Sequence, residues 1–338
     1  MSAIYVLVTV VTKFRLGQSA GNNLYLFLYF IKIEEAALPG GEKSCSSRIG
    51  TSETTREGTE ENIKYIPRHV PKHIKPANDE QFAHYLAGLI DGDGNFSYRH
   101  FTLVFNSSDA SLAYYIKERL GFGYVNKIRN KNAITYVISN KVGIEKVINL
   151  VNGKLRIPFK IDCIQKYLLN AYSTPLNIKT DLSINLSVDL DNYWLAGFSD
   201  ADASFQIKIL NRKRLSGNAI TEIRLNFQVD KKTKDLLELI AKKLGGNIGY
   251  RSSLPSPSGM QGPDTYYYGS TSFGSARSVI KYFDKYPMLS TKHLNYLKWR
   301  KAYLLILDRK HLTVEGKMEI ERLKSSMNKY LDPSVEVY

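Results

Sequence analysis

The sequence predicts an α+β fold made of two related halves, each with the element order αββαββα, arranged about a pseudo-twofold axis. The main observation is a repeat: the string that begins at Tyr85 returns 109 residues later at Trp194. Both copies run from small and apolar residues through two acids that are two positions apart. After each copy, the hydrophobic period changes from that of a helix to the alternation of a strand. Together these features indicate an internal duplication.

Length and charge narrow the class of protein. The chain has 338 residues, 43% of them hydrophobic, which is enough for two modest cores. The formal net charge is +15, and all of the positive excess lies in residues 63–338, the part that carries the repeat. Such a cationic region favours nucleic acid as the partner, with an anionic membrane surface as the alternative. Cys45 and Cys163 are too few for a disulfide framework or a thiolate metal site, so we expect a reducing compartment.

Residues 1–62 are expected to form an N-terminal tail that is disordered or derived from upstream sequence. The apolar stretches 4–11 and 24–33 are shorter than the about 18–20 residues that span a bilayer. An amphipathic import signal is the alternative, although Arg and Ser are sparse at the start. We therefore expect no membrane partner. Residues 34–62, rich in Glu, Gly, Ser and Thr, are typical of a disordered linker.

The first folded half is expected over residues 63–172. Asn78 or Asp79 can cap a helix that ends near Asp91-Gly92, where glycine permits a left-handed residue. The patterns that follow predict strands over 97–106, a helix over 111–120, strands over 124–129 and 134–139, and then helices.

The second half is expected over residues 192–314, after a linker over 173–191. Two polar and apolar alternations predict an antiparallel hairpin with one apolar and one polar face, joined by a basic loop over 211–221. The remaining patterns predict a helix over 233–244, a second hairpin around Tyr250 and 266–271 with a loop over 254–264, a helical region from Ser275, and a C-terminal helix and tail over 315–338.

The second acid of each copy, Asp93 or Asp202, is the candidate catalytic and metal-binding residue. Both stand just past a predicted helix end, where the helix dipole makes a carboxylate unfavourable unless a cation offsets it. The free carbonyls of Gly92 and Ala201 can face the same ion. A few oxygen ligands, with room for water and phosphate, describe a site for Mg²⁺ (or Mn²⁺). Paired metals of this kind hydrolyse phosphodiesters.

Small residues before the acids predict that the two motif helices pack closely. Gly88 and Gly92 are four apart, as are Gly197 and Ala201, so each pair lies on one helix face. Close packing would bring both acids beside the scissile phosphates. A solvated turn is the alternative for one Asp-x-Asp, but two copies in register after matching helices disfavour it. A calcium loop is excluded because its turn glycine and bidentate glutamate are missing.

The polar strand faces supply candidate DNA-binding residues, because their side chains can contact base edges in a major groove and the flanking phosphates. For any one of them, a merely solvated sheet face is the alternative. The candidates are Gln206, Lys208, Arg212, Arg224, Asn226 and Gln228 in the second half, and a thinner set, Ser97, Arg99, Lys127 and Arg129, in the first.

Residues 86–94 (LAGLIDGDG) and 195–203 (LAGFSDADA) resemble the two signature motifs of the LAGLIDADG homing endonucleases in their single-chain form. The resemblance covers about residues 80–310. It implies a monomer with motif helices at the domain interface and saddle-shaped sheets that hold a long, asymmetric double-stranded DNA target. It further implies that the last acid of each motif binds the divalent metals that cut both strands. Because such proteins are commonly encoded in organellar introns, it implies intron homing and a mitochondrial matrix location.

The resemblance implies further site residues. Lys141 stands where the family places a basic residue, and Phe273 occupies that spacing in the second half, so this support is one-sided. Gln228 and Lys231 are similar to polar pocket residues that follow the second strand. The main departure is Ala203, where the motif usually ends in glycine. If that position needs a positive φ, alanine costs about 1 kcal/mol.

Two other functions fit the basic charge: an intron RNA maturase, with or without nuclease activity, and a DNA-binding regulator without catalysis. Intact acids in both motifs favour nuclease chemistry, since a protein that only binds has no use for them. The two copies are unequal, because the second has the cleaner strand alternation and the first has Lys141. We therefore expect two non-identical half-sites.

Overall fold

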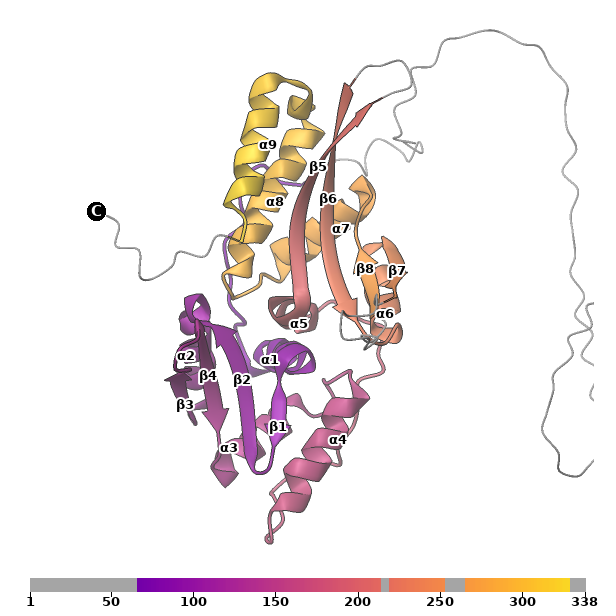
Figure 1. Cartoon of the computed structure of the whole chain (residues 1–338). Helices are drawn as coiled ribbons and strands as arrows, with labels where there is room; N and C mark the ends of the chain where they lie inside the picture. The colour runs from indigo at the N-terminus through magenta and orange to yellow at the C-terminus, as the bar shows by residue number, and fades with distance from the viewer. Residues whose placement is uncertain (1–65, 214–218, 253–264, 329–338) are drawn as a thin grey trace, which may run out of the picture. The chain divides into compact units, whose positions relative to one another are not determined.

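Figure 1 shows a computed structural model of the chain, which describes residues 66–213, 219–252 and 265–328. All the elements described belong to one compact unit. The predicted N-terminal tail, the loop over 254–264 and the side chain of Arg212 lie outside the described residues. Within these ranges, no helix has the length and apolar character needed to cross a membrane.

The first half contains a four-stranded antiparallel sheet with the strand order β1-β2-β4-β3. Its elements are α1 (Asp79–Asp93), β1 (Asn95–Ser97), β2 (His100–Asn106), the 3-10 helix η2 (Ser107–Asp109), α2 (Ala110–Leu120), β3 (Tyr124–Lys127), β4 (Ala133–Ile138), α3 (Lys141–Val151), α4 (Pro158–Tyr167) and the 3-10 helix η3 (Leu169–Ala171).

The second half repeats this arrangement, with the strand order β5-β6-β8-β7. The predicted α+β duplication is therefore confirmed. The elements of this half are α5 (Trp194–Asp202), β5 (Ala203–Lys213), β6 (Ala219–Lys231), α6 (Asp235–Leu244), β7 (Asn247–Arg251), β8 (Thr265–Gly269), α7 (Phe273–Lys285), α8 (Lys292–Leu307), the 3-10 helix η4 (Lys310–Leu312) and α9 (Val314–Ser326). The strands β5 and β6 extend into the predicted basic loop, which shortens the connection.

The ends of the first motif helix follow local chemistry. Asn78 caps α1 as predicted, because its side chain accepts a hydrogen bond from the Gln81 N–H at 2.9 Å. The helix ends at Asp93, close to the predicted Asp91-Gly92, but no left-handed glycine closes it, since the C-cap Gly94 has a φ of −63°. Position 94 requires glycine because the space is crowded: a Cβ on Gly94 would lie 2.8 Å from the Ile90 carbonyl oxygen. Ala203 has a φ of −91°, so the conditional strain does not arise.

Each sheet has one buried apolar face and one open face. In the first sheet, Phe101 and Leu103 of β2 are fully buried, and their register partners on β4, Ile138 and Tyr136, are buried with them. In the second sheet, Phe205 lies within an aromatic cluster whose other members are Phe227, Phe283, Tyr296 and Trp299. These faces form the cores, so the opposite faces remain available to a partner.

The motif helices α1 and α5 pack directly against each other at the junction of the two halves (Figure 1). A Cβ on Gly88 would come within 1.9 Å of the Trp194 carbonyl oxygen. Equivalently, a Cβ on Gly197 would come within 1.9 Å of the Tyr85 carbonyl oxygen. A Cβ on Gly92 would come within 2.2 Å of the Ala201 methyl group. The close packing predicted from the small-residue spacing is confirmed.

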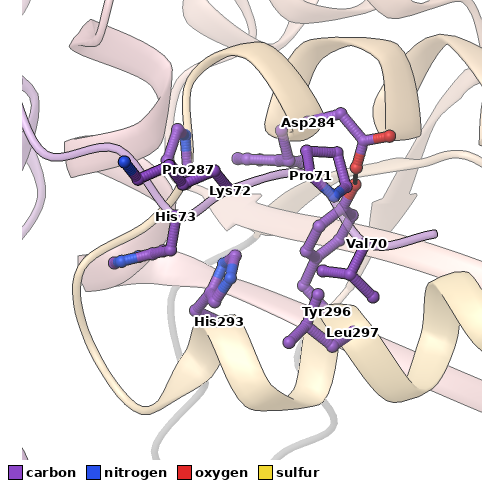
Figure 2. A pocket seen from close by; sticks show the side chains of 10 residues that line it. Val70, Pro71, Lys72, His73, Asp284, Pro287, His293, Tyr296 and Leu297 are labelled. Carbon is purple, nitrogen blue, oxygen red and sulfur yellow. Dashed lines mark hydrogen bonds between the residues drawn. The ribbon is translucent and has the colours of Figure 1, made fainter.

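A segment before α1 connects the start of the described chain to the second half. Arg300 of α8 is buried, pairs with Asp284 at 2.9 Å, and donates a hydrogen bond to the Pro67 carbonyl at 2.7 Å. Further along, His73 bonds the Met288 carbonyl through Nε2 and lies against the ring of His293. Figure 2 shows this segment against α7 and α8, where it lines a small pocket. Burial, with His73 alongside, lowers the pKa of His293 to about 4.

Residues 173–191, the predicted linker, contain no helix or strand. They are nevertheless fixed along α3 by side chains that replace regular backbone pairing. Asn149 accepts a hydrogen bond from the Lys179 N–H at 2.8 Å, and Asn152 accepts one from the Ser183 N–H at 2.9 Å.

The glycine contacts predict a specific mutational pattern. Gly88→Ala or Gly197→Ala should each lower the free energy of unfolding by about 3 kcal/mol, because the new methyl meets a helix backbone that cannot yield cheaply. Gly274→Ala is the control, since a Cβ on Gly274 of α7 meets nothing within 4 Å and alanine favours helix. Urea unfolding measures all three variants. Equal effects would contradict the packing described.

Candidate active site

The close packing of α1 and α5 brings the last acids of both motifs to one place. Asp93 ends α1 and Asp202 ends α5. The Asp202 carboxylate lies beside α1, because its Oδ2 is 3.1 Å from where a Cβ would stand if Gly92 had one. Partial burial and the negative charge of Asp202 together raise the pKa of Asp93, while nearby lysines oppose this change. Two carboxylates that repel each other in this way favour a bound cation between them.

Three lysines surround the acid pair, and only one of them was identified from the sequence. Lys231, at the end of β6, forms an ion pair with Asp202 and lies over the Phe198 ring. Lys292, at the start of α8, donates to the Ser199 and Ala201 carbonyls at 2.9 and 3.1 Å. Lys160 of α4 donates to the Gly94 carbonyl at 2.5 Å.

Lys160 and Lys292 offset the negative ends of the motif helices. Burial lowers the pKa of both ammonium groups, and for Lys292 the nearby carboxylates, including Asp93 and Asp202, oppose this effect. Neither lysine lies near a motif in sequence. They share one sequence signal: each lies close to the start of the second helix that follows the second hairpin of its half.

The first acids of the motifs have a structural role. Asp91 accepts hydrogen bonds from the N–H groups of Arg156 and Ile157, just before α4. In the second half, Asp200 accepts them from Leu289 and Ser290, just before α8. Burial raises the pKa of both carboxyl groups, that of Asp91 to about 6, against the opposing effect of these hydrogen bonds.

The aromatic residue that opens each motif bonds the first acid of the other motif. Trp194 donates its indole N–H to Asp91 at 2.9 Å, and Tyr85 donates its hydroxyl to Asp200 at 2.7 Å. These two hydrogen bonds cross the α1–α5 interface in opposite directions. Trp194 therefore connects the second half to the loop before α4, the helix of Lys160. Tyr85 likewise connects the first half to the loop before α8, the helix of Lys292.

Other predicted catalytic residues lie apart from one another. Lys141 begins α3 and, within the described part of the chain, makes no hydrogen bond or ion pair with either carboxylate. Gln228 and Lys231 point to opposite faces of β6, because they are three residues apart on a strand. Lys231 reaches Asp202, whereas Gln228 donates to Asp230 at 2.9 Å on the open face.

Apart from Arg212, whose side chain is outside the described residues, the predicted DNA-binding residues of the second half share one open face, since Gln206 pairs with Asn226 and Lys208 with Arg224. Lys208 is exposed. Arg224 is paired with Glu222 on its own strand. Asn226 and Gln228 are buried and bonded to each other at 3.1 Å, so close packing of neighbouring side chains limits their access to bases.

Only part of the predicted first-half set lies on the open face. Ser97 is exposed there. Arg99 is in the β1–β2 turn with a φ of 56°, and its guanidinium donates to the Ala171 carbonyl at 2.7 Å. Lys127 is in register with buried Ile134, so it projects from the core side of the sheet edge. Arg129 is exposed in the turn after β3.

The donor set fits a hard divalent cation. Among the described residues, no group of three or more His, Cys, Asp or Glu side chains forms a metal cluster. Asp93 and Asp202 provide two carboxylates, which leaves the remaining positions to water and phosphate oxygens, as Mg²⁺ prefers. The Ala201 carbonyl already accepts from Lys292, so it is a weaker candidate ligand than the sequence implied.

Two pseudo-symmetric sheets, with paired acids at the ends of crossed helices, define the class of two-motif LAGLIDADG proteins. A family model described as LAGLIDADG endonuclease matches residues 86–168 and 195–303. The chain belongs to the LAGLIDADG endonuclease family.

Curated fungal proteins are similar over most of the chain. An uncharacterized cox1 intron-2 protein of 37.2 kDa from Schizosaccharomyces pombe is 49% identical, over 90% of this chain and 89% of its own length. Probable intron-encoded endonuclease 4 of Neurospora crassa is 29% identical, over 73% of this chain but 44% of its own length. The intron-encoded DNA endonuclease aI3 of Saccharomyces cerevisiae is 28% identical, over 68% of this chain and 65% of its own length.

Solved structures share the fold. The LAGLIDADG meganuclease I-CpaMI, bound to uncleaved DNA, has a TM-score of 0.55 and 22% identity, covering 73% of this chain and 99% of that one. I-AabMI, also bound to uncleaved DNA, has a TM-score of 0.57 and 21% identity over the same shares.

The crossed hydrogen bonds predict a cost for removing one hydroxyl. Tyr85→Phe should lower the free energy of unfolding by about 2 kcal/mol, because it leaves buried Asp200 without one of its donors. Tyr114→Phe is the matched control, since Tyr114 is 56% exposed on α2. Chemical unfolding of both variants gives the comparison. A loss of less than about 0.5 kcal/mol in Tyr85→Phe would show that the bond contributes little.

Proposed function

We propose that the protein is a site-specific, divalent-metal-dependent DNA endonuclease that makes a staggered double-strand break in a long target. The observation that carries this proposal is the pair of carboxylates, Asp93 and Asp202, placed together by the α1–α5 packing and surrounded by lysines. Duplicated acids allow one centre for each DNA strand. Family membership supports the same activity.

The acids and the lysines of the site have different proposed roles. Asp93 and Asp202 would hold the divalent ions, with Mg²⁺ as the expected one, and such ions would supply activation of water and stabilisation of charge on the leaving oxygen. Lys231 orients the Asp202 carboxylate through its ion pair. Lys160 and Lys292 neutralise the helix ends and add positive charge where a phosphate backbone would lie. Lys141 and Gln228 remain candidates for a role with bound DNA.

DNA would lie on the open faces of the two sheets, because β1 and β5 begin directly after the two acids. The net charge of +15 supplies the attraction for phosphates. The similar meganucleases I-CpaMI and I-AabMI were solved with DNA, and I-SmaMI was solved with DNA in the presence of calcium ions. We propose a monomer, since one chain carries both motifs.

We place the protein in the mitochondrial matrix, where it would promote homing of its intron. The names of its relatives support this location, above all the cox1 intron protein of Schizosaccharomyces pombe.

RNA maturase activity is a second candidate, favoured by one relative. The intron-encoded RNA maturase bI4 of Saccharomyces cerevisiae is 28% identical, over 59% of this chain and 32% of its own length. The chain spans a third of that protein, so this likeness is weaker support than the acid pair.

The carboxylate pair predicts the effect of isosteric amides. Asp93→Asn and Asp202→Asn should each reduce double-strand cleavage at least about 100-fold, because each removes a charged metal ligand worth several kcal/mol. DNA affinity should change less than about threefold. Targets come from a randomised DNA library bound by the wild-type protein, and cleavage is then followed in Mg²⁺.

Asp181→Asn is the control for this experiment, because Asp181 is exposed and lies outside both motifs. Full cleavage by either motif variant would rule out the paired-acid mechanism.

The maturase candidate is tested with the double variant Asp93→Asn, Asp202→Asn. If an RNA role exists and is separate, splicing of the host intron should persist at wild-type rates while DNA cleavage is lost. Splicing that does not depend on the protein at all would remove this candidate.

A further inference from the structure

The open face of the first sheet contains no Asp, Glu, Lys or Arg side chain. The register places eleven residues of β1, β2, β3 and β4 on this face, opposite the buried core. Apart from one histidine, none of them is acidic or basic: Asn95, Ser97, His100, Thr102, Val104, Asn106, Tyr124, Asn126, Ala133, Thr135 and Val137.

Four β-branched residues form the centre of this face, and we call them the methyl patch. Thr102 pairs with Val137, and Val104 pairs with Thr135, so methyl groups alternate across β2 and β4. Val104 is 46% exposed, although its surroundings are otherwise a well-packed sheet. Apolar groups presented side by side on an open face indicate a partner that also offers apolar groups.

The second sheet has a different open face. It presents Lys208 and Arg224 in register with each other, with Glu222, Asp230 and Arg251 nearby on the same face. Two exposed cations of the first sheet lie instead at its rim, in the turn that joins β3 to β4: Arg129 and Lys131. Such a rim fits phosphates, while the uncharged centre fits base edges.

We propose that the methyl patch reads thymine methyl groups in the major groove, which makes one half of the target rich in A·T pairs. This inference rests on the proposed function. The thymine C5-methyl is the apolar group that base pairs present in the major groove, and Val and Thr side chains can pack against it. Asn95 and Asn126, in register with Thr102 and Thr135, have the side-chain type that bonds adenine N6 and N7.

The position of the patch supports DNA as its occupant. β1 begins two residues after Asp93, so the face continues directly from the proposed cleavage centre. RNA offers uracil, which lacks the methyl group, and its A-form major groove is too deep and narrow for a sheet. The charged face of the second sheet would read its half-site through Lys208, Arg224 and Gln206.

The test uses the full chain and DNA sites selected from a randomised library in Ca²⁺. One half-site should be rich in T·A pairs, and replacing each contacted thymine there by deoxyuridine should weaken binding about fourfold. In the Val104→Ala, Val137→Ala variant this deoxyuridine penalty should fall below half, because only the two threonine methyl groups of the patch remain. The single variant Val104→Ala, at the exposed position, should halve the penalty if the double variant is poorly folded by circular dichroism.

Arg224→Ala is the matched control on the other sheet. It should weaken binding but leave the deoxyuridine penalty of the T·A-rich half unchanged. Sequence-selective DNA binding without a deoxyuridine penalty, or with equal penalties in both halves, overturns this inference alone. A protein that prefers RNA or selects no DNA sequence overturns the proposed function together with it.

Discussion

The glycines of each motif helix contact backbone carbonyls of the other, and the positions of both sheets and both second acids follow from this contact. Gly88 and Gly197 leave no room for a side chain, so α1 and α5 touch backbone to backbone. This backbone-to-backbone contact places the two helix ends side by side. Asp93 and Asp202 form one site only because of it, and both sheets begin from the same two helix ends.

Buried polar groups then make the arrangement specific. Asp91 and Asp200 are desolvated, which is costly, and each recovers part of that cost through hydrogen bonds to backbone N–H groups and to an aromatic residue of the opposite helix. The same loops carry Lys160 and Lys292 to the helix ends. Fixing the first acids therefore also fixes the charges around the second acids. A shift of one half against the other would leave buried carboxylates without donors.

The duplication preserved topology and changed surface chemistry. Strand order is the same in both sheets, and Tyr136 and Tyr268 make equivalent hydrogen bonds to the Phe122 and Gly245 carbonyls. The first hairpin has three residues in β1, whereas β5 has eleven, and only the second sheet carries charge at the centre of its open face. Core positions are constrained by packing, while open faces are free to diverge.

The sequence is enough to predict the duplicated fold, the motif helices and their close packing, the Asn78 cap and the two candidate carboxylates, because each depends on residues that are near in the chain or on the repeat itself. Tertiary structure decided which cations surround the acids: Lys160 and Lys292 meet carbonyls 66 and 91 residues away. It also decided that Arg99 holds Ala171, that Lys127 is on the core side and that Asn226 is buried. Once the register of a strand is known, its local periodicity shows on which face of the sheet each residue lies. Register, helix ends and long-range charge contacts instead follow from packing between distant segments.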